Sequence, residues 1–379
     1  MRIALFDYRV IRTNPVGGCH LRILEGLAER HEFTVFAVEF ENPSPQRIRW
    51  VRIPLPVRPY VALYLLYHLV APLAYFYQRV VRGVHFDLVQ MVESNLLFGT
   101  LSYSHFCHRF YLAQHWTSTN ARGIRGCLRQ MAHRAAALFE PTIYRRVACI
   151  VAPSRGLVNE LRQVYPETGN KARLLPNPVD LESLKPPDER MRLQERKRQG
   201  IADELVLLFV ALGHFERKGL PLVMEAIRDL EDTDITLLVV GGERHLIAQY
   251  KEMAAAMGIS ARVRFAGLQQ DLRPYYWAAD AFVLPSCYEV FPLVALEAAA
   301  AGLPLLATPV NGVEEILTDS YNGFVLERNA RNIAVILRRL AAMTAGERRR
   351  MGLRARKTVL GYGSATFVAG WQKIYDSLA

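Results

Sequence analysis

The sequence predicts an α/β protein with two doubly wound parallel sheets, and three observations lead to this fold class. Short apolar runs of strand length recur along the chain, separated by longer stretches of helical pattern. The 379 residues, 51% hydrophobic and 22% charged, suffice for two domains with buried cores. Residues 177–200 are polar and charged, with Pro186, Pro187 and a basic run at 196–198, as in an interdomain connection. We expect domains at 1–178 and 179–360, followed by a C-terminal helix at 361–379.

In the first domain the strand predictions rest on short runs rich in β-branched and aromatic residues. The predicted strands are residues 2–6, 33–40, 48–55, 86–92, 110–114 and 149–152. Gly17 and Gly18 follow the first strand and precede a helix predicted over residues 21–29. Two glycines let the backbone approach a phosphate closely at a helix N-terminus. The three-glycine dinucleotide fingerprint is not present, so this pair alone is a weak signal.

In the second domain a further series of short apolar runs predicts a second winding of strands and helices. The predicted strands are residues 205–210, 235–240, 263–266, 281–284 and 305–307. Asp232 and Asp234 could suggest a metal site, but they precede a strand, away from the edge where ligands bind in open α/β sheets. We interpret them as a turn. His214 and His245 have no metal-ligand spacing, so no metal is predicted.

The most informative stretch connects the strand 281–284 to the next helix, which we expect to begin near Pro292 and to end at Gly302. Glu289 lies in the turn before that helix, and Glu297 lies inside it. Backbone N–H groups at a helix N-terminus attract a diphosphate, and a carboxylate can accept hydrogen bonds from two sugar hydroxyls. The stretch therefore predicts a pocket for a sugar nucleotide.

Two adjacent cations follow the strand 205–210. Arg217 and Lys218 precede Gly219 and a helix that begins near Leu220. Cations at the carboxyl end of a strand, beside a helix start, suit a leaving diphosphate whose charge must be neutralised. An exposed pair of basic residues is also common on ordinary surfaces. His115, in a segment followed by Thr117, Ser118 and Thr119, is by itself more often a structural residue than a ligand-binding one.

Together these motifs resemble the retaining glycosyltransferases of family 4, which have the GT-B fold: two Rossmann-like domains that face each other across a cleft. The resemblance is strongest over residues 205–326 and includes the E-x7-E pair of Glu289 and Glu297. It implies an N-terminal acceptor-binding domain, a C-terminal donor-binding domain and a last helix that crosses back to the first domain.

The resemblance also implies roles for the site residues. Glu297 would bind the nucleotide ribose, and Glu289 would bind hydroxyls of the donor sugar. The diphosphate would lie near Arg217 and Lys218. A second set would complete the site: Gly17 and Gly18 beside the diphosphate, backbone N–H groups near Phe291 and Leu293, and His115 beside the reacting sugar. Two positions depart from the family pattern, because Leu212 stands where an arginine is usual and Pro292 where a glycine is common.

The function implied is transfer of a sugar from a UDP-, GDP- or ADP-sugar to an acceptor hydroxyl with retention of anomeric configuration, without metal or another cofactor. A diphosphate oxygen would take the acceptor's proton, so no protein nucleophile is needed. A glycan, lipid-linked or phosphorylated acceptor would place the enzyme in cell-envelope glycolipid or polysaccharide synthesis. The alternatives are a GT-B sugar-nucleotide epimerase and a non-catalytic scaffold at a membrane surface.

The net charge of +11 lies wholly in the first half, where residues 1–175 hold 22 Lys and Arg against 11 Asp and Glu. Such a surface suits an anionic partner or merely aids solubility, and no nucleic-acid motif accompanies it.

Residues 60–77 are almost wholly apolar and aromatic, and are read as a spanning helix, a core helix or a helix on the bilayer surface. Five cysteines without C-x-x-C spacing indicate a cytoplasmic protein. Peripheral association with the inner face of the plasma membrane is a further option.

Overall fold

The computed structural model describes residues 1–117 and 123–379, which divide into two compact units. Unit 1 comprises Met1–Pro178 and Ser364–Ala379, and unit 2 comprises Val179–Gly363. The last helix, Ser364–Asp376, thus belongs to unit 1 and begins three residues later than expected. The chain enters unit 2 only once, so that unit is continuous in sequence.

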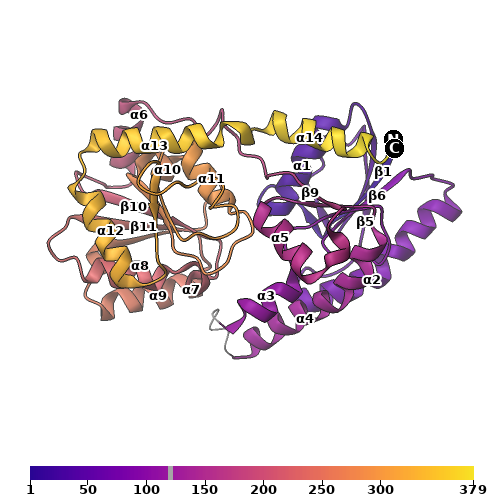
Figure 1. Ribbon diagram of the computed structural model, residues 1–379, viewed down its shortest axis with the longest axis horizontal. Coiled ribbons are helices and arrows are strands. Elements are labelled where there is room, and N and C mark those ends of the chain that lie inside the picture. The colour runs from indigo at the N-terminus through magenta and orange to yellow at the C-terminus, as the bar shows by residue number, and fades with distance from the viewer. Residues whose placement is uncertain (118–122) are drawn as a thin grey trace. The chain divides into compact units, whose positions relative to one another are not determined.

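Unit 1 is built on a seven-stranded sheet of order β5-β3-β1-β6-β7-β8-β9, and all its strand pairs are parallel (Figure 1). A separate parallel bridge joins β2 (Arg9–Val10) to β4 (Glu39–Phe40). The sheet strands are β1 Arg2–Phe6, β3 Glu32–Ala37, β5 Ile48–Arg52, β6 Leu88–Val92, β7 Leu101–Tyr103, β8 Cys149–Ala152 and β9 Ala172–Leu174. The helices are α1 Pro15–Leu27, α2 Tyr60–Phe76 with a π-helical end at Tyr77–Val81, α3 His108–Gln114, α4 Gly123–Arg146, α5 Arg155–Val164, a 3-10 turn at Pro166–Thr168 and α14 Ser364–Asp376.

The two faces of this sheet are covered by different helices. On one face, α1 and α14 pack together, and Phe367, Trp371 and Tyr375 of α14 are buried at four-residue spacing. On the other face, α2 packs through Tyr75, whose ring contacts Phe6 and Phe36. Helices on both faces exclude water from the central strands, so β6 and β8 are buried along their whole length, whereas most of the edge strand β5 is not buried.

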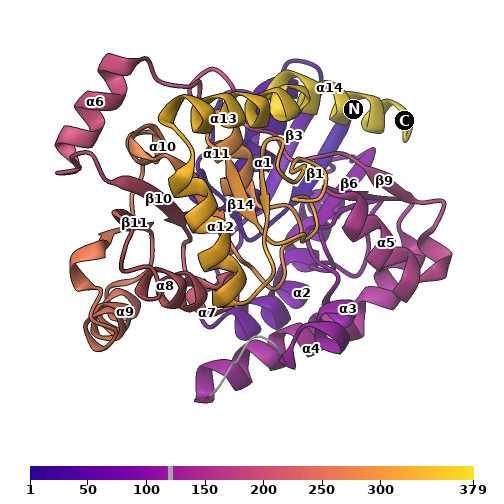
Figure 2. The ribbon, with the colours of Figure 1, turned by 60° about the vertical axis from the view of Figure 1, so that its left-hand side comes forward.

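Unit 2 has a six-stranded parallel sheet of order β12-β11-β10-β13-β14-β15 (Figure 2). One face packs on α8, α9 and α12, and the other on α10, α11 and α13. The strands are β10 Leu205–Val210, β11 Ile235–Val240, β12 Val263–Gly267, β13 Ala281–Leu284, β14 Leu305–Ala307 and β15 Gly323–Val325. The helices are α6 Glu189–Arg198, α7 Phe215–Lys218, α8 Leu220–Arg228, α9 Arg244–Ala256, α10 Arg273–Ala278, α11 Leu293–Ala300, α12 Ala330–Ala342 and α13 Ala345–Val359, with 3-10 turns at Ser260–Arg262 and Leu360–Tyr362.

Three sequence predictions are corrected by the structure. The strand predicted at 110–114 is helical, because these residues belong to α3, while the three-residue β7 was missed. The predicted strand 33–40 is interrupted at Val38. The interdomain connection 177–200 contains α6, whose Arg196 is buried and donates to the Asp280 carboxylate at 3.2 Å. That distant partner compensates the charge of Arg196, which the local sequence does not reveal.

Candidate functional site

The strand order of unit 2 reverses direction between β10 and β13. From β10 the chain proceeds outward to β11 and β12, and then returns to β13 on the other side of β10. In open α/β sheets, ligands bind at such a switch point, beyond the carboxyl ends of the strands. The two loops that leave these ends, residues 211–219 and 285–292, contain most of the residues that the sequence singled out in this domain.

The loop after β10 is shaped by two left-handed residues, His214 (φ 57°) and Gly219 (φ 81°), on either side of the short α7. Phe215 anchors this turn, since its buried ring contacts Phe209 and Tyr250 edge-on. A Cβ atom at Gly219 would lie 2.3 Å from the Pro285 carbonyl oxygen. Gly219 therefore allows the first loop to pack directly against the second.

Arg217 joins the two loops. Its guanidinium donates to the Tyr288 carbonyl oxygen at 2.6 Å, and its own carbonyl oxygen accepts from the Cys287 N–H at 3.0 Å. The predicted diphosphate-binding residue thus holds the backbone of the second loop. Part of the guanidinium is already hydrogen-bonded to the protein backbone, so its role in binding diphosphate stays a prediction.

Lys218 and Glu289 form an ion pair at the centre of this edge. The lysine Nζ lies 2.6 Å from Glu289 Oε1, and the Ser286 hydroxyl donates to the same oxygen at 3.0 Å. Burial raises the pKa of the Glu289 carboxyl, but the charges of Lys218 and Arg217 and these hydrogen bonds outweigh it and bring the pKa below its ordinary value. In the described part of the chain, both hydrogen bonds to this carboxylate use Oε1, which leaves Oε2 for a ligand hydroxyl.

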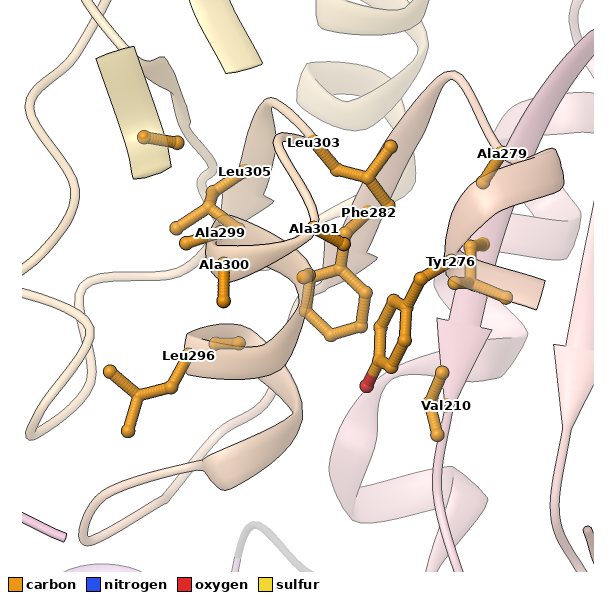
Figure 3. Close-up of a cluster of buried hydrophobic side chains, with 14 of the residues drawn as sticks. Val210, Tyr276, Ala279, Phe282, Leu296, Ala299, Ala300, Ala301, Leu303 and Leu305 are labelled. Atoms are coloured by element: carbon orange, nitrogen blue, oxygen red, sulfur yellow. The ribbon is translucent and has the colours of Figure 1, made fainter. Parts of the chain in front are cut away.

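Glu297 lies one helix turn further from the loop, in α11, and has a different environment. Tyr276 of α10 donates its hydroxyl to Glu297 Oε2 at 2.8 Å. Burial raises the pKa of the carboxyl to about 7, although the tyrosine hydrogen bond opposes the rise. The Tyr276 ring itself belongs to the apolar core, where Figure 3 shows it beside Phe282 and Val210. This ring fixes the hydroxyl that orients Glu297.

The turn between the two glutamates differs in detail from the prediction. Pro292 is the N-cap of α11 and not its first helical residue, and its carbonyl oxygen accepts the first helical hydrogen bonds, from Ala295 and Leu296. Phe291 is buried, and Gly312 lies so close to it that a Cβ atom at Gly312 would be 2.8 Å from Phe291 Cα. Leu293 is the first residue of the helix. Binding of donor by backbone N–H groups near Phe291 and Leu293 stays a prediction.

Gly17 and Gly18 lie at the start of a helix in unit 1, and only Gly17 is tightly packed. They lie in the first turn of α1, which begins at Pro15, so the expected start near residue 21 is wrong. The Gly17 N–H donates to the Asn14 side chain at 2.8 Å, and the Gly18 N–H donates to the Asn14 carbonyl oxygen at 2.7 Å. A Cβ atom at Gly17 would lie 2.1 Å from the Arg9 carbonyl oxygen. Gly17 is thus needed for packing against β2, and diphosphate binding by this pair stays a prediction.

His115 does not follow a strand. It is the C-cap of α3, and burial lowers its pKa. Of the hydroxyl residues beside it, Ser118 and Thr119 lie outside the described residues. The histidine that does follow a strand in this region is His105, two residues beyond β7. Because this three-residue strand was not predicted, the sequence analysis did not single out His105, and the role of His115 stays a prediction.

The hydrogen bonds of His105 determine its chemistry. Burial lowers its pKa to about 4, so the ring is neutral near pH 7. Its Nε2 lies 3.1 Å from the Asn177 side-chain oxygen, which can only accept, so Nε2 carries the proton. The remaining ring nitrogen, Nδ1, is buried and has no hydrogen-bond partner within residues 1–117 and 123–379. This atom is an acceptor without a donor, as expected for a group that receives a ligand hydroxyl.

Comparisons with known proteins agree with this architecture. Two family models match the chain: Glycosyltransferase Family 4 over residues 20–183 and Glycosyl transferases group 1 over residues 191–358. The lipopolysaccharide core biosynthesis glycosyltransferase LpsE of Rhizobium meliloti is 34% identical over 154 residues, which are 40% of this chain and 44% of LpsE. The chain spans about half the length of the curated relatives it matches.

Solved structures show the same fold at low sequence identity. WaaG, a glycosyltransferase involved in lipopolysaccharide biosynthesis, superposes with a TM-score of 0.79 at 19% identity, over 98% of this chain and 99% of WaaG. HepE of Anabaena, solved in complex with UDP and glucose, superposes with a TM-score of 0.76 at 16% identity over the whole of both chains.

Proposed function

The chain belongs to the family 4 glycosyltransferases of the GT-B fold, and we propose that it transfers a sugar from a nucleoside-diphosphate sugar to an acceptor hydroxyl. The observation that carries this proposal is the Lys218–Glu289 pair at the switch point of unit 2. A cation and a carboxylate with one unoccupied oxygen, side by side, match a substrate that carries a diphosphate next to a sugar.

For donor binding, Lys218 would neutralise charge on the diphosphate while Glu289 Oε2 accepts from a hydroxyl of the transferred sugar. Glu297, oriented by Tyr276, would accept from the ribose hydroxyls, for which its carboxyl must be ionised. HepE was solved with UDP and glucose, which makes a UDP-sugar the first donor to test and GDP- and ADP-sugars the alternatives.

For the reaction itself, we propose retention of anomeric configuration without a metal. As the bond between the sugar and the diphosphate breaks, negative charge builds on the diphosphate, and Lys218 stabilises that charge. The acceptor hydroxyl attacks the face that the diphosphate leaves, and its proton passes to a diphosphate oxygen. Of the two histidines of unit 1, His105, whose ring is neutral, would take the place of His115 in holding a sugar hydroxyl, and its buried Nδ1 would first have to be uncovered.

The acceptor is the least defined part of the proposal. LpsE and WaaG both take part in lipopolysaccharide biosynthesis according to their names, which supports a cell-envelope glycan as the acceptor class. The basic first half of the chain agrees with an acceptor that carries phosphate or other negative charge.

The test is a thermal-stability screen of the full chain with UDP-, GDP- and ADP-sugars, followed by product analysis. A donor that binds only the folded state raises the unfolding midpoint, and at a hundredfold excess over its Kd it adds about 2.7 kcal/mol. We expect one nucleotide class to raise the midpoint of the wild type, and to raise that of Glu289→Gln by less. NMR of the product would then show the configuration of the new bond. No shift with any nucleotide, or release of an epimer without acceptor, would refute the proposal.

A further inference from the structure

The helix α2 with its π-helical end exposes an unusual amount of apolar surface along one side. Tyr60–Val81 is long and apolar enough, by length and composition, to cross a membrane, yet only part of it is buried in the protein. Its exposed large apolar side chains recur at helical spacing and so share one side. Apart from Tyr60 at the first residue of the helix, they are Leu65, Leu66, Leu69, Leu73, Phe76, Tyr77, Val80 and Val81, here called the α2 face. Leu69 and Leu73 are 65% and 69% exposed.

The opposite side of the same helix is fixed to unit 1. The Tyr67 hydroxyl donates to the Phe36 carbonyl oxygen of β3 at 2.7 Å, and Tyr64 and His68 both hydrogen-bond to Ser94. A spanning helix would be surrounded by lipid and would lose these partners, leaving polar groups unsatisfied in hydrocarbon. The structure therefore favours a helix that lies along a surface over one that crosses a bilayer.

The apolar segment contains no charged residue, but arginines flank it on both sides in the sequence. Residues 59–78 contain no Asp, Glu, Lys or Arg, and Arg79 and Arg82 follow immediately. Across residues 42–86 there are six arginines and no acidic residue. An exposed apolar stripe bordered only by cations is the pattern of helices that lie in the interface of a membrane with anionic lipids.

The neighbouring α4 extends the same character. It packs beside α2, and Phe139 of α4 stacks on His68 at a ring distance of 4.8 Å. Leu138 and Met131 of α4 are 74% and 51% exposed, and Arg134 is exposed as well. In sequence, residues 94–139 again contain arginines and no acidic residue. Figure 1 shows α2 and α4 running along one side of unit 1.

We propose that the α2 face binds the surface of a membrane that contains anionic lipids, with the leucines in the acyl boundary and Arg79 and Arg82 among the headgroups. Charge selects this partner over a second copy of the chain. Two copies joined through this face would bring their own arginines together, whereas anionic headgroups are complementary to them. The proposal does not depend on sugar transfer.

The experiment is co-sedimentation of the full chain with vesicles of phosphatidylcholine alone or mixed equally with phosphatidylglycerol. We expect binding to the anionic vesicles, weak binding to the neutral ones, and loss in high salt. The double variant Leu69→Glu/Leu73→Glu should lose at least about tenfold in partitioning into vesicles, because charges replace two apolar side chains that would enter the acyl boundary of the membrane. Arg79→Gln/Arg82→Gln should lose about tenfold on the anionic vesicles only.

A matched control places the same two charges elsewhere. Leu193 and Val335 of unit 2 are 58% and 56% exposed, and Leu193→Glu/Val335→Glu should bind vesicles like the wild type. Circular dichroism would show that each variant is folded. Equal binding by the wild type and Leu69→Glu/Leu73→Glu would overturn the proposal. So would self-association that this variant abolishes while no vesicle binds, because the face would then join two copies.

Discussion

The two units have the same kind of sheet, but the polar residues at their switch points differ in burial. In unit 1 the order reverses between β1 and β6, where Asp7 lies 2.8 Å from His20 and both side chains are almost wholly buried. His20 in turn contacts Gln90, which accepts from the Tyr375 hydroxyl at 2.6 Å. In unit 2 the charged groups of Lys218 and Glu289 are on loops and are partly exposed.

The difference shows that topology alone does not define a binding site. An acidic residue follows the relevant strand in both units, Asp7 after β1 and Glu289 in the loop after β13. In unit 1 its partners are buried protein groups that complete the core, whereas in unit 2 one carboxylate oxygen remains for a ligand. Unit 1 has several buried polar atoms without a partner among the described residues, and one of them is Nδ1 of His105, which follows β7, one strand away from the switch point.

The largest expected effect tests the switch point of unit 2. Glu289→Ala and Lys218→Ala should each lower turnover by about 10² or more, as is typical when one group that stabilises the transition state is removed. Steady-state transfer assays with the identified donor measure this effect. Arg273→Ala, which removes an exposed pair with Asp271 in the same unit, should change turnover less than about twofold. Near-normal activity of either site variant would contradict the assignment.

The second prediction concerns unit 1. His105→Ala should lower turnover about tenfold or more, because a tenfold change corresponds to the free energy of roughly one hydrogen bond to a substrate hydroxyl. His115→Ala should have a smaller effect. The activities of the two variants under identical conditions decide between the positions. A larger loss with His115→Ala would restore the histidine that the sequence favoured.

The third prediction separates packing from ligand binding at the glycine pair. Gly17→Ala should destabilise the protein by about 1–3 kcal/mol, because its Cβ would overlap the Arg9 carbonyl. At Gly18 the nearest atom to a Cβ would be 3.6 Å away, so Gly18→Ala should be tolerated. Denaturant unfolding measures both changes. If a stably folded Gly18→Ala protein lost donor binding, a direct role of this glycine toward phosphate would be supported.

The smallest effect is a pH dependence in unit 2. The folded pKa of Glu297, about 7, lies above the ordinary 4.5, so the folded state holds this proton more tightly and loses stability as the pH rises from 4.5 to 7. Glu297→Gln cannot ionise, and should raise the thermal midpoint by about 2–4 °C at pH 8 and hardly at pH 5. Equal shifts at both pH values would show that ionisation is not the cause.

The sequence was a better guide to strands and single residues than to their partners. Continuous apolar runs predicted β1, β10, β11 and β13 with their observed bounds, since such runs suit strands buried on both faces. The three-residue β7 and β9 were missed because Ser102 and Arg173 interrupt their apolar pattern, whereas the equally short β14 is wholly apolar and was predicted. The helix α6 was taken for a linker because its sequence is strongly charged. Its contacts are distant in sequence, because Arg192 and Arg196 both donate to Asp280, which is 88 and 84 residues away.

The same limit applies to the site. Lys218 and Glu289 were each identified from their places after a strand, but a pairing across 71 residues depends on the strand order. Tyr276, which orients Glu297, gave no sequence signal because an aromatic residue in an apolar helix normally indicates packing. His105 could have been found from its place after an apolar run, had the brief Leu101–Tyr103 strand been recognised.

The placement of α14 has a consequence for protein synthesis. Unit 2 is continuous, so all its strands can pair as soon as it has left the ribosome, whereas unit 1 needs residues made after unit 2 is finished. Until then the apolar side of α1 lacks the cover of Phe367 and Trp371, and Gln90 lacks the Tyr375 hydroxyl. Until α14 has been made, the nascent chain thus carries a finished second unit together with a first unit whose apolar surface is still open.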